Sequence, residues 1–194
     1  MASFLIGYKS REGQTAKVAD RVASALEQRG HEVRTISVTE WSSADSIADY
    51  DAVLLGDSIH LGRHAKQMIR FVRDHRDELA VRPNGFFQVS LSAADPDDED
   101  GQTETVTYIH EFVEKTGWEP DQIGVFGGAL RYSKYGFITR YVMKRIARNN
   151  LGITDTSRDH EFTDWDEVET FALDFAVLVE SQVGGEGETG ESAA

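Results

Sequence analysis

The chain lacks cysteine and long apolar runs. None of its 194 residues is cysteine, which excludes disulfides, thiolate metal sites and a thiol nucleophile. No stretch approaches the roughly 18 consecutive apolar residues of a membrane-spanning helix. The apolar run at residues 1–7 is too short for a signal peptide and has no basic leader. We therefore expect a cytoplasmic protein.

Lysine is also scarce, and positive charge is in deficit. The chain has 34 acidic residues against 20 basic ones, which gives a net charge of −14. This balance argues against a general nucleic-acid binder. It suits a protein kept soluble in high salt, although an ordinary acidic cytosolic protein has a similar balance. With 40% hydrophobic residues the chain belongs to the globular class, and its length predicts one domain.

Motifs for metal binding and hydrolysis are missing as well. Among the six histidines, only His60 and His64 have i, i+4 spacing, and they straddle a glycine in an expected loop, so we predict no metal site. The acidic run 95–101 places Asp100 where a calcium-binding EF-hand loop requires glycine. We interpret this run as a solvated loop. No Gly-x-Ser-x-Gly motif supports a hydrolase.

What the sequence does contain is an alternation of strand and helix patterns. Short apolar runs predict strands at 3–8, 31–38, 51–56, 85–91 and 123–127, and a 3.6-residue apolar period predicts helices at 15–29, 64–79 and 104–116. Residues 39–50 are turn-rich, with room for one helical turn. Asp164 and Glu167 form a capping box that opens a last helix. Strands that are apolar on both faces belong to a covered parallel sheet. We therefore predict an α/β fold with a doubly wound, five-stranded parallel sheet.

Composition divides the chain into three parts. Residues 1–183 form the predicted domain, with an insert at about 128–160 before the last helix. Residues 184–194 are rich in glycine, glutamate and serine, and we expect a disordered acidic tail there.

The loop after the first predicted strand has the composition of an anion site. Ser10 and Thr15 supply hydroxyls, Gly13 lies between them, and the helix that follows presents free amides. The loop is neither a Walker motif nor a Gly-x-Gly-x-x-Gly dinucleotide motif. Simple helix capping is the alternative.

The pattern Ser-x-x-Gly-x-Thr at 10–15, directly after the first strand, resembles the FMN-phosphate loop of flavodoxins. In that family two further loops, after the third and fourth strands, hold the flavin ring, and here they correspond to 58–62 and 90–93. The resemblance implies a flavodoxin-like fold, FMN as the cofactor, and the following contacting residues: Ser10, Arg11, Glu12, Gly13, Gln14, Thr15, Ser58, Ile59, His60, Gly62, Ser90, Leu91, Ser92 and Ala93.

The insert is basic in an otherwise acidic chain. Residues 130–153 contain six bases and no acid. Residues 137–148 fit a helix on which Arg140, Lys144 and Arg148 form one stripe. Such a helix suits an anionic membrane surface or a carboxylate-bearing substrate; the alternative is a solvated helix packed on the body of the protein. The candidate contact residues are Arg131, Tyr132, Tyr135, Arg140, Lys144 and Arg148.

The Gly-Ala-Leu-Arg-Tyr-x-x-Tyr run at 128–135, the basic helix, and the later Thr-Asp-Thr and Thr-Asp-Trp motifs at 154–156 and 163–165 resemble the menaquinone-dependent protoporphyrinogen IX dehydrogenases. That resemblance implies an FMN-dependent dehydrogenase that passes electrons from a reduced tetrapyrrole to a quinone. It also implies peripheral membrane contact through 131–150 and no obligatory catalytic side chain. The alternatives are a flavodoxin electron carrier and an NAD(P)H:quinone reductase.

Overall fold

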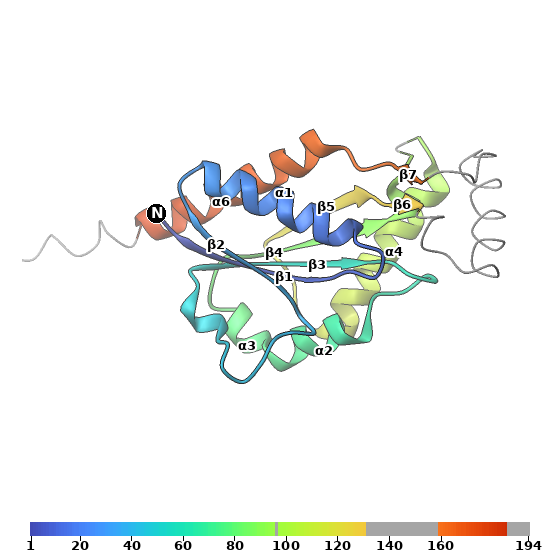
Figure 1. Ribbon diagram of the computed structural model, residues 1–194. Coiled ribbons are helices and arrows are strands. Elements are labelled where there is room, and N and C mark those ends of the chain that lie inside the picture. The colour runs from blue at the N-terminus through green and yellow to red at the C-terminus, as the bar shows by residue number, and fades with distance from the viewer. Residues whose placement is uncertain (96, 131–158, 186–194) are drawn as a thin grey trace, which may run out of the picture.

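The computed structural model describes residues 1–95, 97–130 and 159–185. Five parallel strands form one sheet in the order β2-β1-β3-β4-β5 (Figure 1). The strands are β1 (Ser3–Lys9), β2 (Glu32–Ser37), β3 (Ala52–Ser58), β4 (Asn84–Ser90) and β5 (Gln122–Gly127). The predicted doubly wound fold is confirmed.

The central strands are buried on both faces. Every residue of β4 is buried, as is every residue of β3 except Ser58, which accounts for the apolar runs 52–56 and 85–87 within them. The edge strand β2 is only partly buried, and four of its six residues are polar or charged. The sequence pattern of each strand therefore reflects its place in the sheet.

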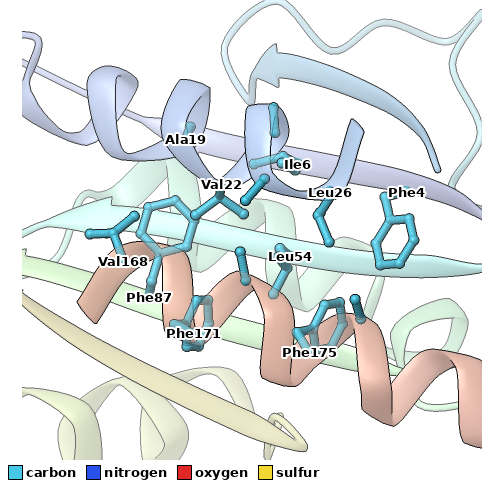
Figure 2. Packing of buried hydrophobic residues seen from close by; sticks show 14 of the residues in the cluster. Phe4, Ile6, Ala19, Val22, Leu26, Leu54, Phe87, Val168, Phe171 and Phe175 are labelled. Atoms are coloured by element: carbon cyan, nitrogen blue, oxygen red, sulfur yellow. The ribbon is translucent and has the colours of Figure 1, made fainter. Parts of the chain in front are cut away.

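Two helices, α1 (Gln14–Gln28) and α6 (Trp165–Gly185), cover one face of the sheet. Figure 2 shows Val22 and Leu26 of α1 and Phe171 and Phe175 of α6 pointing into the same apolar layer. Phe175 meets Phe4 of β1 edge-on, with ring centroids 6.0 Å apart. This layer joins the last helix to the first strand and first helix.

The other face carries the helices α2 (Lys66–Asp74), α3 (Arg76–Leu79) and α4 (Glu99–Thr116), with the short 3₁₀ turns η1 (Ile47–Asp49) and η2 (Leu91–Ala93). Phe86 of β4 stacks on Phe112 of α4 at 4.4 Å. Trp118 meets both rings edge-on. None of the helices in the described part of the chain has the length and apolarity that a membrane crossing requires.

Two predicted elements differ from the structure. The helix predicted at 64–79 is two helices, because His75 leaves helical geometry (φ −115°, ψ 12°) and packs against Trp41 and Phe71. The acidic run at 95–101 is not wholly a loop, because α4 begins at Glu99. Acidic residues are favourable in the first turn of a helix, where they face its positive dipole end.

The root of the insert is a ribbon that the sequence pattern does not predict. β6 (Ala129–Leu130) and β7 (His160–Glu161) pair antiparallel. The basic helix predicted at 137–148 and the six candidate contact residues of the insert lie outside the described residues. Helix α6 extends to Gly185, two residues into the predicted tail, and the rest of that segment also lies outside the described residues.

Candidate functional site

A cavity of about 370 Å³ lies at the carboxyl ends of β1, β3 and β4. This is where the strand order reverses and where doubly wound sheets bind ligands. The volume lies within the roughly 300–1,000 Å³ range of small-molecule sites. Three loops line it, one after each of these strands, together with α4 and the first residues after β5.

The structure brings the predicted site residues together. All of the residues expected to contact the cofactor line this cavity except Gly13 and Ala93. Gly13 instead shapes the first loop, and Ala93 ends the 3₁₀ turn η2. The remaining expected residues form the wall: Ser10, Arg11, Glu12, Gln14, Thr15, Ser58, Ile59, His60, Gly62, Ser90, Leu91 and Ser92.

The loop after β1 presents the amino end of α1 to the cavity. Gly13 has φ 98°, a left-handed conformation that glycine adopts without strain. Its N–H donates to the Ser10 Oγ atom at 3.0 Å, which closes the loop. The first turn of α1 contains no acidic residue, so its amides and dipole are available to an anion.

Two side chains of this first turn have different roles. Thr15 is 1% exposed, and its Oγ1 atom has no hydrogen-bond partner among the described residues. Gln14, in contrast, donates through Nε2 to the Thr163 Oγ1 atom at 2.8 Å, so its amide side chain is directed toward the segment before α6. A buried hydroxyl without a partner requires an explanation, and an anion on the α1 amides would provide one.

The other two loops are tied to the sheet. Ile59 N–H donates to the Val89 carbonyl at 3.0 Å, and Gly128 N–H donates to the Ser90 carbonyl at 2.8 Å. The Ser92 hydroxyl lies 3.0 Å from that of Ser90 and 3.1 Å from that of Thr105 on α4. These bonds fix the loops after β3 and β4 along the part of the cavity away from α1.

The residues on the α4 side of the cavity are not among those expected to contact the cofactor. Its lining includes Asp98, Asp100, Glu104 and Tyr108. Burial, followed by the nearby Glu104 carboxylate, raises the pKa of the Tyr108 phenol. The spacing of residues 101, 104 and 108 on one helix face is a signal that could have indicated this wall. The turn residue Leu61 and the ribbon residues Gly128 and Ala129 were likewise not expected.

This arrangement suits an elongated ligand with an anionic group at one end. The anion would lie on the α1 amides, and a ring system would fit between the loops after β3 and β4. No group of three metal-type ligands occurs in the part of the chain that the structure describes. The cavity therefore combines an anion cradle at α1 with space bounded by the loops after β3 and β4.

Comparison with known proteins agrees with this geometry. A family model described as "Flavodoxin domain" matches residues 5–157. Among solved structures, a short-chain flavodoxin associated with a PDU bacterial microcompartment has a TM-score of 0.57 at 14% identity, over 92% of this chain and 99% of that one. Oxidised flavodoxin 1 from Bacillus cereus has a TM-score of 0.53 at 15% identity, over 92% and 97%. The fold and the site define a flavodoxin-like protein, a class that binds flavin.

Two curated relatives identify the family of this chain within the flavodoxin-like class. Protoporphyrinogen IX dehydrogenase [quinone] from Escherichia coli K12 is 33% identical over 91% of this chain and 96% of its own length. The protein of the same name from Leishmania major is 33% identical over 90% and 74%. The chain belongs to the family of these quinone-dependent protoporphyrinogen IX dehydrogenases. It is accordingly an oxidoreductase.

Proposed function

We propose that this protein binds FMN and passes electrons from a reduced tetrapyrrole to a quinone. The observation that carries the proposal is the anion cradle at the start of α1, with its buried and unpartnered Thr15 hydroxyl. A phosphate monoester fits one helix amino end, and the loop has no dinucleotide motif that would favour FAD or NAD. When bound, FMN supplies the redox chemistry.

The residues of the cavity would bind and orient this cofactor. Thr15 and the α1 amides would hold the phosphate, and Ser10 would keep the loop closed through its bond to Gly13. The loops bearing Ile59 and Ser92 would flank the ring. None of these side chains is required as an acid or a base, so the protein contributes binding, orientation and electrostatics.

The charges of the cavity would orient an acidic substrate. Asp98, Asp100 and Glu104 make the α4 wall negative, whereas the loop after β1 carries one base, Arg11, beside one acid, Glu12. Carboxylates of a tetrapyrrole would therefore point away from α4. In the sequence, the basic residues of the insert follow β6, whose residue Ala129 lines the cavity.

Flavin titration and a donor screen test this function. The purified protein should bind FMN more tightly than FAD or NAD and quench its fluorescence. Under anaerobic conditions protoporphyrinogen should bleach the bound flavin, and a quinone should restore its colour. Reduction by NADPH but not by protoporphyrinogen would favour a quinone reductase. Reduction only by a partner redox protein would favour an electron carrier.

We also propose that the basic insert approaches an anionic membrane in which the quinone is dissolved. Each base near such a surface contributes about 1 kcal/mol. Combined Arg140→Glu, Lys144→Glu and Arg148→Glu substitutions should slow reduction of membrane quinone, leave FMN bound and spare a soluble quinone analogue. Unchanged activity with both quinones would contradict membrane contact.

A matched charge reversal on α2 and α3 provides the control. Lys66, Arg70 and Arg76 are exposed on α2 and α3, and changing all three to Glu alters net charge by the same amount as the insert variant. Membrane-quinone activity should stay near that of the wild type. If both triple variants lose it equally, overall charge is responsible and the insert is not.

A further inference from the structure

Two ionisable side chains are buried beneath the loop that follows β3. Asp57, near the end of β3, is fully buried, and His64 is 6% exposed. His64 donates through Nδ1–H to the Asp57 Oδ2 atom at 3.2 Å, since a carboxylate oxygen can only accept. The Ala65 N–H donates to the same oxygen at 2.7 Å. Asp57 therefore joins the two ends of the loop 58–63.

The surroundings of this pair are mostly aromatic. The His64 ring lies 4.7 Å from that of Phe112 and 5.5 Å from that of Phe86. Gln88, the register neighbour of Asp57 on β4, is fully buried. Asp57 Oδ1, His64 Nε2 and both Gln88 amide atoms have no hydrogen-bond partner among the described residues. Well-packed apolar residues at such positions are often at least as stable, so general stability does not account for the pair.

The loop above the pair needs external support. Its tip is a turn closed by His60 N–H donating to the Arg63 carbonyl at 3.1 Å. Leu61 and Gly62 in this turn have φ values of 51° and 71°. Positive φ is unfavourable for leucine, and the Leu61 side chain is 71% exposed, so packing does not compensate for it.

The same loop forms one wall of the cavity through Ser58, Ile59 and His60. Its start is tied to β4 by the Ile59 N–H, which donates to the Val89 carbonyl at 3.0 Å. Its end is tied to the sheet by Asp57. A strained loop held at both ends can keep main-chain dipoles fixed next to a bound ring.

We propose that Asp57 and His64 are positioning residues: without touching the flavin, they hold the loop 58–63 against its ring and so set the ring's affinity and reduction potential. This inference rests on the proposed function. It predicts that the two halves of the cofactor site have separate roles. The loop after β1 would hold the phosphate, and the pair beneath the loop after β3 would act on the ring alone.

Three variants test the pair. Asp57→Ala removes both bonds, His64→Leu removes one, and His64→Asn offers an amide N–H in place of Nδ1–H. Asp57→Ala and His64→Leu should weaken FMN and riboflavin alike, by about tenfold, and His64→Asn should restore most of the affinity. The midpoint potential of the bound flavin should shift in Asp57→Ala and His64→Leu. The shift should be about 30 mV for each tenfold by which the loss of affinity for oxidised flavin differs from the loss for reduced flavin.

Asn84→Ala is the matched control. Asn84 is 4% exposed at the start of β4 and donates through Nδ2 to the Leu79 carbonyl, so its loss should lower the melting temperature without changing ring affinity or potential. If Asp57→Ala and His64→Leu also lower the melting temperature without changing ring affinity or potential, the pair is only structural and the inference is overturned.

Hydrogen exchange on the flavin-free protein separates this inference from the proposed function. Amides 59–65 should exchange at least tenfold faster in His64→Leu than in the wild type, whether or not Asp57→Ala folds. Unchanged exchange would overturn the inference even if FMN binds. Conversely, His64→Leu could show faster exchange while the wild type binds no flavin. That result would overturn the proposed function and the effect of the pair on the flavin ring, but it would still show that Asp57 and His64 hold the loop 58–63.

Discussion

Thr15 shows how a single side chain can be placed by its neighbours for a ligand. Its Oγ1 atom is buried in the first turn of α1 and lacks a partner among the described residues. Local sequence explains the placement, because Gly13 allows the left-handed turn that starts the helix. The cost of burying an unpaired hydroxyl is recovered only when an acceptor or donor enters the cavity.

Thr15→Ala should weaken FMN by about ten- to a hundredfold, because a hydrogen bond to a charged group contributes roughly 1.5–3 kcal/mol. Riboflavin, which has no phosphate, should bind nearly as before. Fluorescence titration with both flavins measures the difference. Thr170→Ala on α6, whose hydroxyl donates to the Asp166 carbonyl, should change neither affinity. Equal weakening of FMN and riboflavin by Thr15→Ala would show that Thr15 supports the loop instead.

At the scale of elements, helix α4 forms a wall of the site because it packs closely on the loop after β4. A Cβ atom at Gly101 would lie 2.5 Å from the Ser92 carbonyl oxygen and 2.8 Å from the Asp98 Oδ2 atom. Only glycine permits this approach. The absence of a side chain at Gly101 therefore allows the first turn of α4 to pack against the loop after β4.

Gly101→Ala should lower the free energy of unfolding by about 1–3 kcal/mol, since overpacking against backbone forces a shift. It should also weaken flavin binding, because Ser92 lines the cavity. Urea denaturation and FMN titration measure the two effects. Val106→Ala on the same helix, where Val106 is 69% exposed, should stay within about 0.5 kcal/mol of the wild type. A Gly101→Ala protein as stable as the wild type would show that α4 can move away without cost.

The pairing of α1 with α6 should depend on pH. Hydrogen bonds from Arg29 lower the pKa of Glu180 to about 2, with the His31 charge contributing. A lowered pKa stabilises the fold above the unfolded value of roughly 4.3, and this contribution is lost as the pH falls toward 2.

The stability difference between the wild type and Glu180→Gln should therefore be larger at pH 7 than at pH 3. It should be small throughout, because water screens an exposed pair. Denaturant unfolding at both pH values measures it, with Glu27→Gln on α1 as the control. A difference that grows on acidification would contradict the assigned direction of the pKa shift.

At the scale of the whole molecule, net charge is the dominant feature. The total of −14 means that acidic groups repel one another at low ionic strength. Molar salt shortens the Debye length to about 3 Å and suppresses this repulsion. We therefore expect the folded state to become more stable as the salt concentration rises.

Thermal melts in increasing KCl should show the effect. From low salt to molar KCl the melting temperature should rise by several degrees. Melts in sucrose at matched osmolality are the control, because sucrose is uncharged and cannot screen the acidic groups. They separate charge screening from the stabilisation that an excluded solute gives. A flat or falling melting temperature would show that repulsion does not limit stability.

Much of this protein could be inferred from neighbouring residues. The five strands follow from short apolar runs such as those in β3 and β4, and the parallel sheet follows from their alternation with helices. The loop 10–15 is recognisable because its glycine and hydroxyls lie within six consecutive positions. These features depend on local backbone preferences and on a hydrophobic period, both of which can be read along the chain.

Other features depended on the tertiary structure. The pairing of Asp57 with His64 and the β6–β7 ribbon each join residues whose contact is decided by how a loop returns to the sheet. The break at His75 has the same origin, because Trp41 packs against it from a distant turn. Such contacts arise only when the sheet sets the positions of its covering helices, and no local pattern records that geometry.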